Sequence, residues 1–177
     1  VGGDLFAWAE WQWFLFSGDR ARLAAVYPAL LAYHRWIRKH RTWKDGTYFS
    51  SGWGCGMDNQ PRQKPGYSCE FHHGRMVWAD ACIQQILSCQ TLVKMAKLIG
   101  RERDVESLAE EQSRLTKVVN EKLWDDQTAY YYDLWDDGRL NGVKSIGAYW
   151  ALLAGIVPSD KLDAFVAHLE NPAEFKR

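Results

Sequence analysis

The sequence lacks the features that place a chain in a membrane or against a polyanion. It contains no apolar run of the roughly 18 residues that a membrane-spanning helix needs. Its 22 Lys and Arg are balanced by 22 Asp and Glu, whereas binding to nucleic acid or to an anionic membrane surface needs a basic surplus. We therefore expect neither a nucleic-acid partner nor a membrane partner.

The amino terminus lacks a targeting signal. No positively charged stretch is followed there by an apolar core and a small-residue cleavage site. The sequence begins with Val1 instead of Met, so we expect it to be a processed or excised piece of a longer protein.

Cysteine is scarce, with four residues and no Cys-x-x-Cys pair. This excludes a dense disulfide framework and a zinc-ribbon site. Cys82 and Cys89 lie in a helical pattern and are expected to be buried thiols. Cys55 and Cys69 flank one loop, and the sequence leaves open whether they form a disulfide.

Aromatic residues, in contrast, are abundant. The chain has 10 Trp, 8 Tyr and 7 Phe, which make up 14% of its residues. Either the core is unusually rich in rings, or the protein binds a ligand with a flat apolar face.

Helical periodicity recurs in three pairs of segments. In each pair the first segment is apolar on nearly all sides, and the second is apolar along one stripe only. The first segments span 5–16, 76–99 and 146–154, and the second span 23–41, 104–123 and 159–169. Pro28 is expected to kink or split one of the second segments. On 104–123 the sequence places the charged residues, Glu111 among them, on the polar face.

A helix that is apolar all round needs neighbours on every side, so the pairs predict an inner and an outer ring of helices. The pairs begin about 70 residues apart, which is typical of an all-α fold built as an α/α toroid. Six such hairpins need roughly 400 residues, so residues 1–177 are expected to form three hairpins of a partial (α/α)6 barrel. The long loops, 41–75 and 124–143, then gather at the N-terminal ends of the inner helices.

The first long loop has the composition of a sugar site. Glycines bracket Trp53 and precede Asp58, so the backbone can approach a ligand beside an aromatic face. Pro61 stiffens the chain after this acid. Because Arg62 would oppose protonation of Asp58 if the two touched, we expect Arg62 to pair with another carboxylate or to support the loop. Cleavage of a glycosidic bond needs a carboxylic acid to protonate the leaving oxygen, which Asp58 can supply.

The segment 56–62, Gly-Met-Asp-Asn-Gln-Pro-Arg, resembles the signature of glycoside hydrolase family 63 and its mannosylglycerate and glucosylglycerate hydrolase relatives, and more distantly that of trehalases. The resemblance implies an (α/α)6 barrel that hydrolyses an α-glycosidic bond with inversion. It also implies that Asp58 is the general acid. Trp78-Ala79-Asp80 is similar to the start of the helix that follows this motif in the family, which makes Asp80 a candidate site residue.

From this resemblance we expect a small saccharide or glycoside as substrate. Trp53 would stack on the sugar, while Tyr48, Asn59 and Asp80 would bind hydroxyls. The binding residues would be completed by Gly56 and Arg62. The family's general base is a Glu that follows the helices seen here, so the partner that completes the site would be the other half of the barrel. The leading expectation for location is a bacterial cytoplasm.

Less specific interpretations stay open beside this one. Asp58 can cap a turn, and Asp80 can be a first-turn helix carboxylate that faces the helix dipole. A sugar epimerase or isomerase on an α/α barrel would use His72 and His73 as acid and base. A non-catalytic carbohydrate-binding or structural fragment is a third possibility. His72 and His73 with Cys69 match no standard zinc spacing, so we predict no metal and no cofactor.

Overall fold

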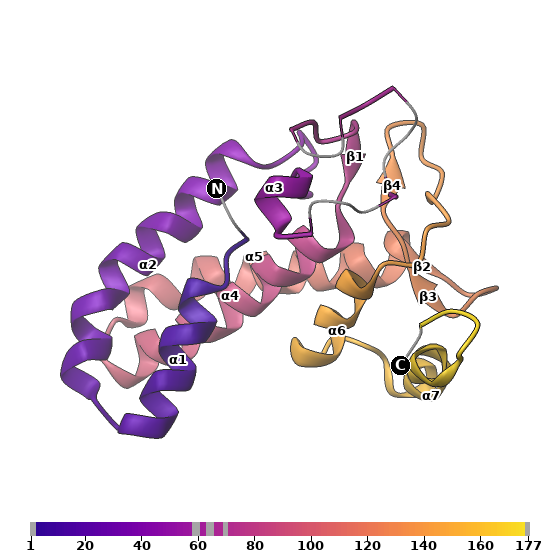
Figure 1. Ribbon diagram of the computed structural model, residues 1–177. Helices are drawn as coiled ribbons and strands as arrows, with labels where there is room; N and C mark the ends of the chain where they lie inside the picture. Colours follow the sequence, from indigo (N-terminus) through magenta and orange to yellow (C-terminus); the bar gives the residue numbers. More distant parts are fainter. Residues whose placement is uncertain (1–2, 58–60, 63–65, 69–70, 176–177) are drawn as a thin grey trace.

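The computed structural model describes residues 3–57, 61–62, 66–68 and 71–175, and it is mostly helical (Figure 1). The α-helices in this part of the chain are α1 (Phe6–Ser17), α2 (Arg20–His40), α3 (Gly52–Cys55), α4 (Ala79–Leu98), α5 (Val105–Val118), α6 (Trp150–Leu153) and α7 (Ser159–Glu170). The strands are β1 (Met76–Val77), β2 (Trp124–Asp125), β3 (Tyr130–Tyr131) and β4 (Leu134–Trp135). Single 3-10 turns precede α5 and α6, and a π turn at Val119–Leu123 continues α5.

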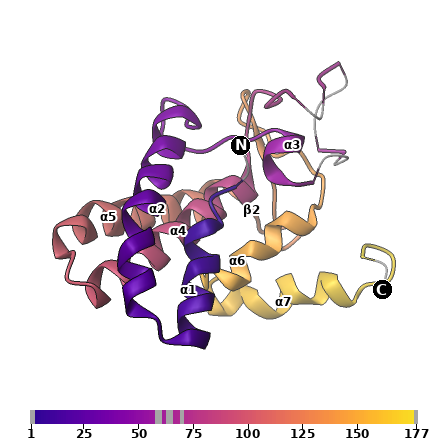
Figure 2. The same ribbon diagram turned by 60° about the vertical axis from the view of Figure 1, so that its left-hand side comes forward.

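The first two helices form the predicted hairpin and lie side by side (Figures 1 and 2). Gly18 ends α1 with a φ of 68°, a left-handed conformation that glycine adopts without strain. Asp19 then begins α2, because its carboxylate accepts the backbone N–H of Arg22 at 2.9 Å. The second helix continues unbroken through Pro28, so the alternative of two separate helices does not apply.

Helix α4 is the centre of the molecule. It packs against α1, α2, α5 and α6. Buried residues occupy every side of this helix, including polar ones such as Asp80, Gln85 and Ser88. The prediction that this segment is an inner helix is therefore confirmed.

Helix α1 is less buried than its sequence predicts. Among its residues Ala7 is fully buried, whereas four large apolar side chains are at least half exposed. These are Phe6 at 58%, Trp13 at 50%, Leu15 at 60% and Phe16 at 85%. The reason is geometric: within the described residues α1 packs against α2 and α4, and its opposite face has no neighbour.

The third inner segment also differs from the expectation of a continuous helix over 146–154. Ser145 caps a 3-10 turn at Ile146–Tyr149, and α6 then adds a single turn of α-helix. Gly155, with a φ of 62°, ends this turn before α7 begins. The sequence therefore predicted the apolar character of the segment but not its length.

Short antiparallel strands form two pairs, one between the two long loops and one within the second loop. In one pair Met76 of β1 faces Trp135 of β4, and in the other Trp124 of β2 faces Tyr131 of β3. Because β1 leads directly into α4 and β4 lies in the loop that follows α5, the first pair brings both loops to the N-terminal end of α4 (Figure 1). The predicted gathering of these loops at one end of the inner helices is confirmed for this pair.

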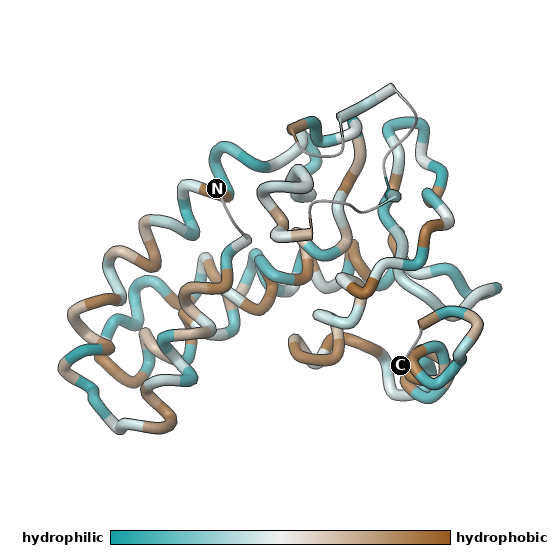
Figure 3. The backbone as a smooth tube through the Cα atoms, viewed as in Figure 1, coloured by the Kyte–Doolittle hydropathy of each residue, from teal (hydrophilic) through white to brown (hydrophobic). Residues whose placement is uncertain are grey.

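Two apolar clusters fill the interior. One joins the first half of α4 to α5, α6, α7 and the tyrosines of 130–132, and the other lies between α1, α2 and the second half of α4. The C-terminal end of α2, which carries the basic residues Arg38, Lys39 and His40, is hydrophilic (Figure 3). Among the described helices none is both long and apolar enough to cross a bilayer.

Candidate active site

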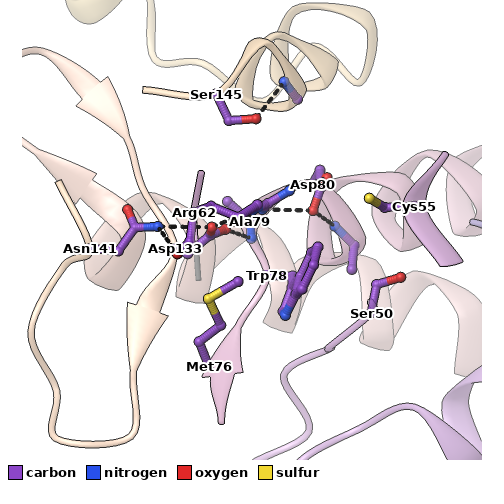
Figure 4. A network of polar contacts seen from close by, with 12 residues as sticks. Ser50, Cys55, Arg62, Met76, Trp78, Ala79, Asp80, Asp133, Asn141 and Ser145 are labelled. Carbon is purple, nitrogen blue, oxygen red and sulfur yellow. Dashed lines mark hydrogen bonds and ion pairs between the residues drawn. The ribbon is translucent and has the colours of Figure 1, made fainter. Parts of the chain in front are cut away.

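Arg62 lies at the centre of the site that the two long loops form at the head of α4 (Figure 4). Its side chain is buried, and Nη1 and Nη2 donate to the two carboxylate oxygens of Asp80 at 2.8 and 3.1 Å. Its Nε donates to Asp133 at 2.6 Å, and Nη2 bonds the same carboxylate. The planar guanidinium thus ties the motif loop to α4 and to the second loop at once. We call Arg62, Asp80 and Asp133 the Arg62 clamp.

Asp133 also stabilises the start of α4. Its Oδ1 accepts the backbone N–H of Ala79 at 2.8 Å, one of the donors that has no partner inside a helix. Asn141 donates to Oδ2 of Asp133 at 3.1 Å and to the carbonyl oxygen of Arg62 at 3.3 Å. The predicted pairing of Arg62 with another carboxylate is present, but sequence reasoning did not single out Asp133 or Asn141. The available signal was an acid directly after the aromatic run 130–132, which is buried throughout.

The charges of the clamp are unequal. Burial by itself lowers the pKa of Arg62, but the negative charges of Asp133 and Asp80 outweigh it and hold the pKa well above its ordinary value. One guanidinium cation faces two acidic side chains at the N-terminal end of α4, where the helix dipole favours negative charge. Burial raises the pKa of Asp133, and the charge of Arg62 opposes this shift. The guanidinium carbon also lies 4.2 Å from the centre of the Trp78 ring, a cation–π contact.

Asp80 approaches the third hairpin closely. A methyl group built on Gly147 would lie 3.0 Å from Oδ2 of Asp80 and 3.0 Å from the terminal carbon of Met57. Met57 is the residue before Asp58 in the sequence. The structure therefore brings together the motif loop, the head of α4 and the start of the third inner segment.

Trp53 projects from the short helix α3 and is 60% exposed. Its ring lies 4.9 Å from that of Phe71, which is 68% exposed, so the two form an open aromatic surface. Ser51 begins α3 by accepting the N–H of Gly54, and Gly56 ends it with a φ of 74°. An exposed ring on a glycine-rich loop is the arrangement that stacking on a sugar requires, and the role of Trp53 stays a prediction.

Tyr48 points away from the Arg62 clamp. It is buried, and its hydroxyl donates to a carboxylate oxygen of Glu111 in the interior. The structure therefore does not bring Tyr48 and Asp80 together as sugar ligands. The N–H groups of Arg62 likewise donate to two buried carboxylates, and its side chain does not face an open surface.

Asp58 and Asn59 lie outside the described residues, as does Cys69. The general-acid role of Asp58 therefore stays a prediction. Cys55 is a free thiol, so the disulfide that the sequence left open for it is not formed. The thiol of Cys55 donates to the carbonyl oxygen of Gly52 at 3.2 Å. Burial, followed by the negative charge of Asp80, raises the pKa of this thiol.

The histidines of the first loop belong to a turn. Nδ1 of His72 accepts the backbone N–H of Gly74, and Nδ1 of His73 accepts that of Arg75. The His73 ring packs edge-on against Trp43, and burial lowers its pKa. Both side chains thus help to hold the turn together, and these contacts account for them without a role as the acid and base of an epimerase.

A second polar cluster lies inside the molecule, where His34 meets Asp4, Cys89 and Glu111. Glu111 was expected on the polar face of its helix, and this expectation is wrong. Glu111 is buried, and its carboxylate bonds His34 and Tyr48 in the interior. Burial opposes the charge of His34, but hydrogen bonds to Asp4, Cys89 and Glu111 raise its pKa to about 11. Among the described residues, His34, Cys89 and Glu111 form the cluster whose donors could hold a metal ion.

Known proteins share this architecture. The GH63 mannosylglycerate hydrolase from Thermus thermophilus, solved in complex with glucose, superposes with a TM-score of 0.82 at 20% identity, over 96% of this chain and 51% of that one. The GH78 family rhamnosidase of a Bacillus species gives a TM-score of 0.78 at 19% identity, over 96% of this chain and 17% of that one. The predicted α/α toroid fold is therefore confirmed.

A sequence relative and a family model extend the likeness. An uncharacterized protein of Borreliella burgdorferi is 22% identical over 175 residues, which is 99% of this chain and 35% of that protein. The chain thus spans about half of the Thermus enzyme and about a third of the Borreliella protein. The model of the mannosylglycerate hydrolase MGH1-like glycoside hydrolase domain matches residues 4–177. Since that match covers nearly the whole chain, the chain belongs to the family of MGH1-like glycoside hydrolase domains, as its motif predicted.

Proposed function

We propose that the protein hydrolyses an α-glycosidic bond of a small glucosyl or mannosyl substrate with inversion of configuration. Asp58 donates its proton to the glycosidic oxygen as the bond from the anomeric carbon to that oxygen breaks. A Glu outside the present 177 residues takes a proton from water, whose oxygen bonds to the anomeric carbon from the opposite face.

The observation that carries this proposal is the Arg62 clamp. Arg62 follows Asp58 by four residues in the sequence, and it is bonded to Asp80 at the head of the central helix. The clamp thus fixes the downstream end of the motif at the face where the long loops meet, and positioning of this kind is a main source of catalytic rate.

The charge of the clamp also suits a general acid. A lone guanidinium beside the acid would lower its pKa and favour its ionised form. Here Asp80 and Asp133 compensate the guanidinium, so its positive charge is not available to lower the pKa of a neighbouring carboxyl group. An acid held at this face would therefore keep its proton nearer to neutral pH.

The substrate class rests on the relatives together with the exposed aromatic surface of Trp53 and Phe71. Structures of the Thermus thermophilus enzyme contain glucose in one case and Tris with D-glycerate in another. We therefore propose a hexose joined by an α-bond to a small polar group such as glycerate.

The test uses the full-length protein, as do the other activity measurements, and follows the sugar product by proton NMR as it forms from α-mannosylglycerate and α-glucosylglycerate. Inversion predicts that the β-anomer appears first. The Asp58→Asn variant should lose roughly 10²–10⁴-fold in kcat while it still binds sugar, as expected when general acid catalysis is removed. The control variant Asp160→Asn, on α7, should keep full activity.

Three outcomes would contradict the proposal. Unchanged turnover in Asp58→Asn would show that Asp58 is not the general acid. Release of the α-anomer as the first product would show that the reaction retains the configuration. A C2 epimer formed without bond cleavage would favour the epimerase hypothesis instead.

A further inference from the structure

Three side chains with metal-binding donors converge between α2, α4 and α5, apart from the proposed active site. They are His34, Cys89 and Glu111, and all three are buried. Nε2 of His34 lies 3.3 Å from Oε2 of Glu111 and 3.7 Å from Sγ of Cys89. The three donor atoms all lie within 4.8 Å of one another.

The two separations from Nε2 of His34 match edges of a tetrahedral zinc site. With ordinary zinc–ligand bond lengths, tetrahedral angles place nitrogen about 3.3 Å from oxygen and about 3.6 Å from sulfur. We propose that His34, Cys89 and Glu111 bind one divalent transition-metal ion of the zinc type. Imidazole, thiolate and carboxylate each bind zinc, whereas a set with a thiolate and an imidazole is unsuited to the hard cations Mg²⁺ and Ca²⁺.

The surroundings already provide what the ligands of such a site need. The other ring nitrogen of His34 lies 3.1 Å from a carboxylate oxygen of Asp4, and Ser88 donates to that same oxygen at 2.6 Å. A carboxylate behind the metal-binding histidine orients the ring and makes it a better donor. The second oxygen of Glu111 accepts from Tyr48, so the metal would bind Oε2, which also pairs with Arg38.

Gln85 packs against the imidazole of His34. It is 1% exposed, and its Oε1 has no hydrogen-bond partner among the described residues. Its amide nitrogen lies 3.0 Å from Nδ1 and 3.2 Å from Nε2 of His34, so it borders both ring nitrogens and not the position beyond Nε2 where the metal would lie. The protein thus supplies three ligands, and a zinc-type ion with three protein ligands completes its tetrahedron with water.

The charge of the cluster allows a divalent ion. A metal ion needs the neutral imidazole of His34 and the thiolate of Cys89, and the thiolate and the Glu111 carboxylate together compensate a divalent charge. Arg38, which lies 3.2 Å from Oε2 of Glu111, stays as an outer partner of that carboxylate. Cys89 follows Asp80 by nine residues on α4, about 13 Å along the helix axis, so the metal lies well away from the Arg62 clamp.

The test uses the intact protein and Co²⁺ as a probe, because tetrahedral Co²⁺ bound to a thiolate gives a ligand-to-metal charge-transfer band. We expect one Co²⁺ per chain, competed off by Zn²⁺, and one zinc per chain by elemental analysis of protein grown with zinc. Cys89→Ser should lose the charge-transfer band. Cys82→Ser, which changes a buried thiol elsewhere on the same helix, should keep it.

Two further variants test metal binding if Cys89→Ser fails to fold. Asp4→Asn should weaken Co²⁺ binding by roughly 10–100-fold, the usual effect of losing a partner behind a metal ligand. Glu111→Gln should weaken it at least as much. A folded wild-type protein without a charge-transfer band or stoichiometric metal would overturn the proposal. Loss of the band in Cys82→Ser but not in Cys89→Ser would do the same.

Discussion

A guanidinium that is shared by two buried carboxylates holds the motif loop in place, and its removal leaves those carboxylates facing each other. Arg62→Ala should therefore cost about 3–5 kcal/mol of unfolding free energy, the range for breaking a buried ion pair. Arg62→Lys should cost less, but it loses the planar fork that bonds Asp80 and Asp133 together. Urea unfolding measures both values.

The same variants separate stability from positioning. We expect Arg62→Lys to lower kcat by at least tenfold at a temperature where circular dichroism shows the chain fully folded. Arg139→Lys, which alters an exposed pair with Asp137, is the matched control and should behave as wild type. If Arg62→Lys keeps the kcat and the stability of the wild type, the clamp does not position the motif loop for catalysis.

Trp53 offers a second test at the level of one side chain. If its exposed ring stacks on the sugar, Trp53→Ala should raise KM about threefold to tenfold with little change in unfolding free energy, because such aromatic contacts contribute about 0.5–1.5 kcal/mol. Trp36→Ala, at another exposed tryptophan on α2, should leave KM unchanged. Equal effects in the two variants would argue against the stacking role.

Single residues show where sequence reasoning stops. The pattern predicted that Arg62 pairs with a carboxylate other than Asp58, but Asp133 is 71 residues away and becomes a partner only through the pairing of β1 with β4. Glu111 was assigned to a polar face because its neighbours on α5 are charged. Its burial depends on His34 and Tyr48, and helical periodicity within one segment does not reveal partners on other elements.

At the scale of elements, the close approach between the third hairpin and α4 depends on a residue without a side chain. Gly147→Ala would place a methyl group 3.0 Å from Oδ2 of Asp80, and the clamp prevents that carboxylate from moving aside. We expect a loss of about 1–3 kcal/mol in unfolding free energy, as for overpacking elsewhere, together with reduced kcat/KM.

Gly18→Ala is the control for this substitution. Nothing lies within 4 Å of the added methyl group there, and the cost comes only from a φ of 68°. It should lower the melting temperature without changing kcat/KM. If Gly147→Ala behaves in the same way, the contact with Asp80 is not part of the functional arrangement.

Helices were predictable from the sequence to different degrees. The apolar pattern located α4 and the amphipathic pattern located α2, because each agrees with the neighbours that the fold provides. The third inner segment was predicted too long, since an apolar run does not distinguish 3-10 turns from α-helix. The strands contain two residues each, too few to show any alternation.

At the scale of the whole molecule, the apolar outer face of α1 should dominate behaviour in solution when the 177 residues are produced alone. Exposed apolar patches of this kind promote association. We expect concentration-dependent self-association in analytical ultracentrifugation, reduced in the double variant Leu15→Ser and Phe16→Ser. The pair Ile146→Ser and Leu153→Ser, at exposed apolar residues of the third hairpin, provides a comparison. A monomeric wild-type piece at all concentrations would contradict the expectation.

Spacing was the most informative feature at this scale. A recurrence of about 70 residues predicted a ring of hairpins, and the likeness to the Thermus enzyme confirms that fold. The recurrence also predicted that this length holds three hairpins of a ring of six, and this stays a prediction. Spacing carries no information on the general base, which we propose to lie beyond these residues.

The Arg62 clamp also bears on how the chain folds. Its bonds join residues 18 and 71 positions apart, so they form only after two loops have closed, each at an entropic cost. The helical hairpins rest on local contacts, which carry a smaller cost. We therefore expect a partly denatured chain to keep its helical circular dichroism after the clamp has opened.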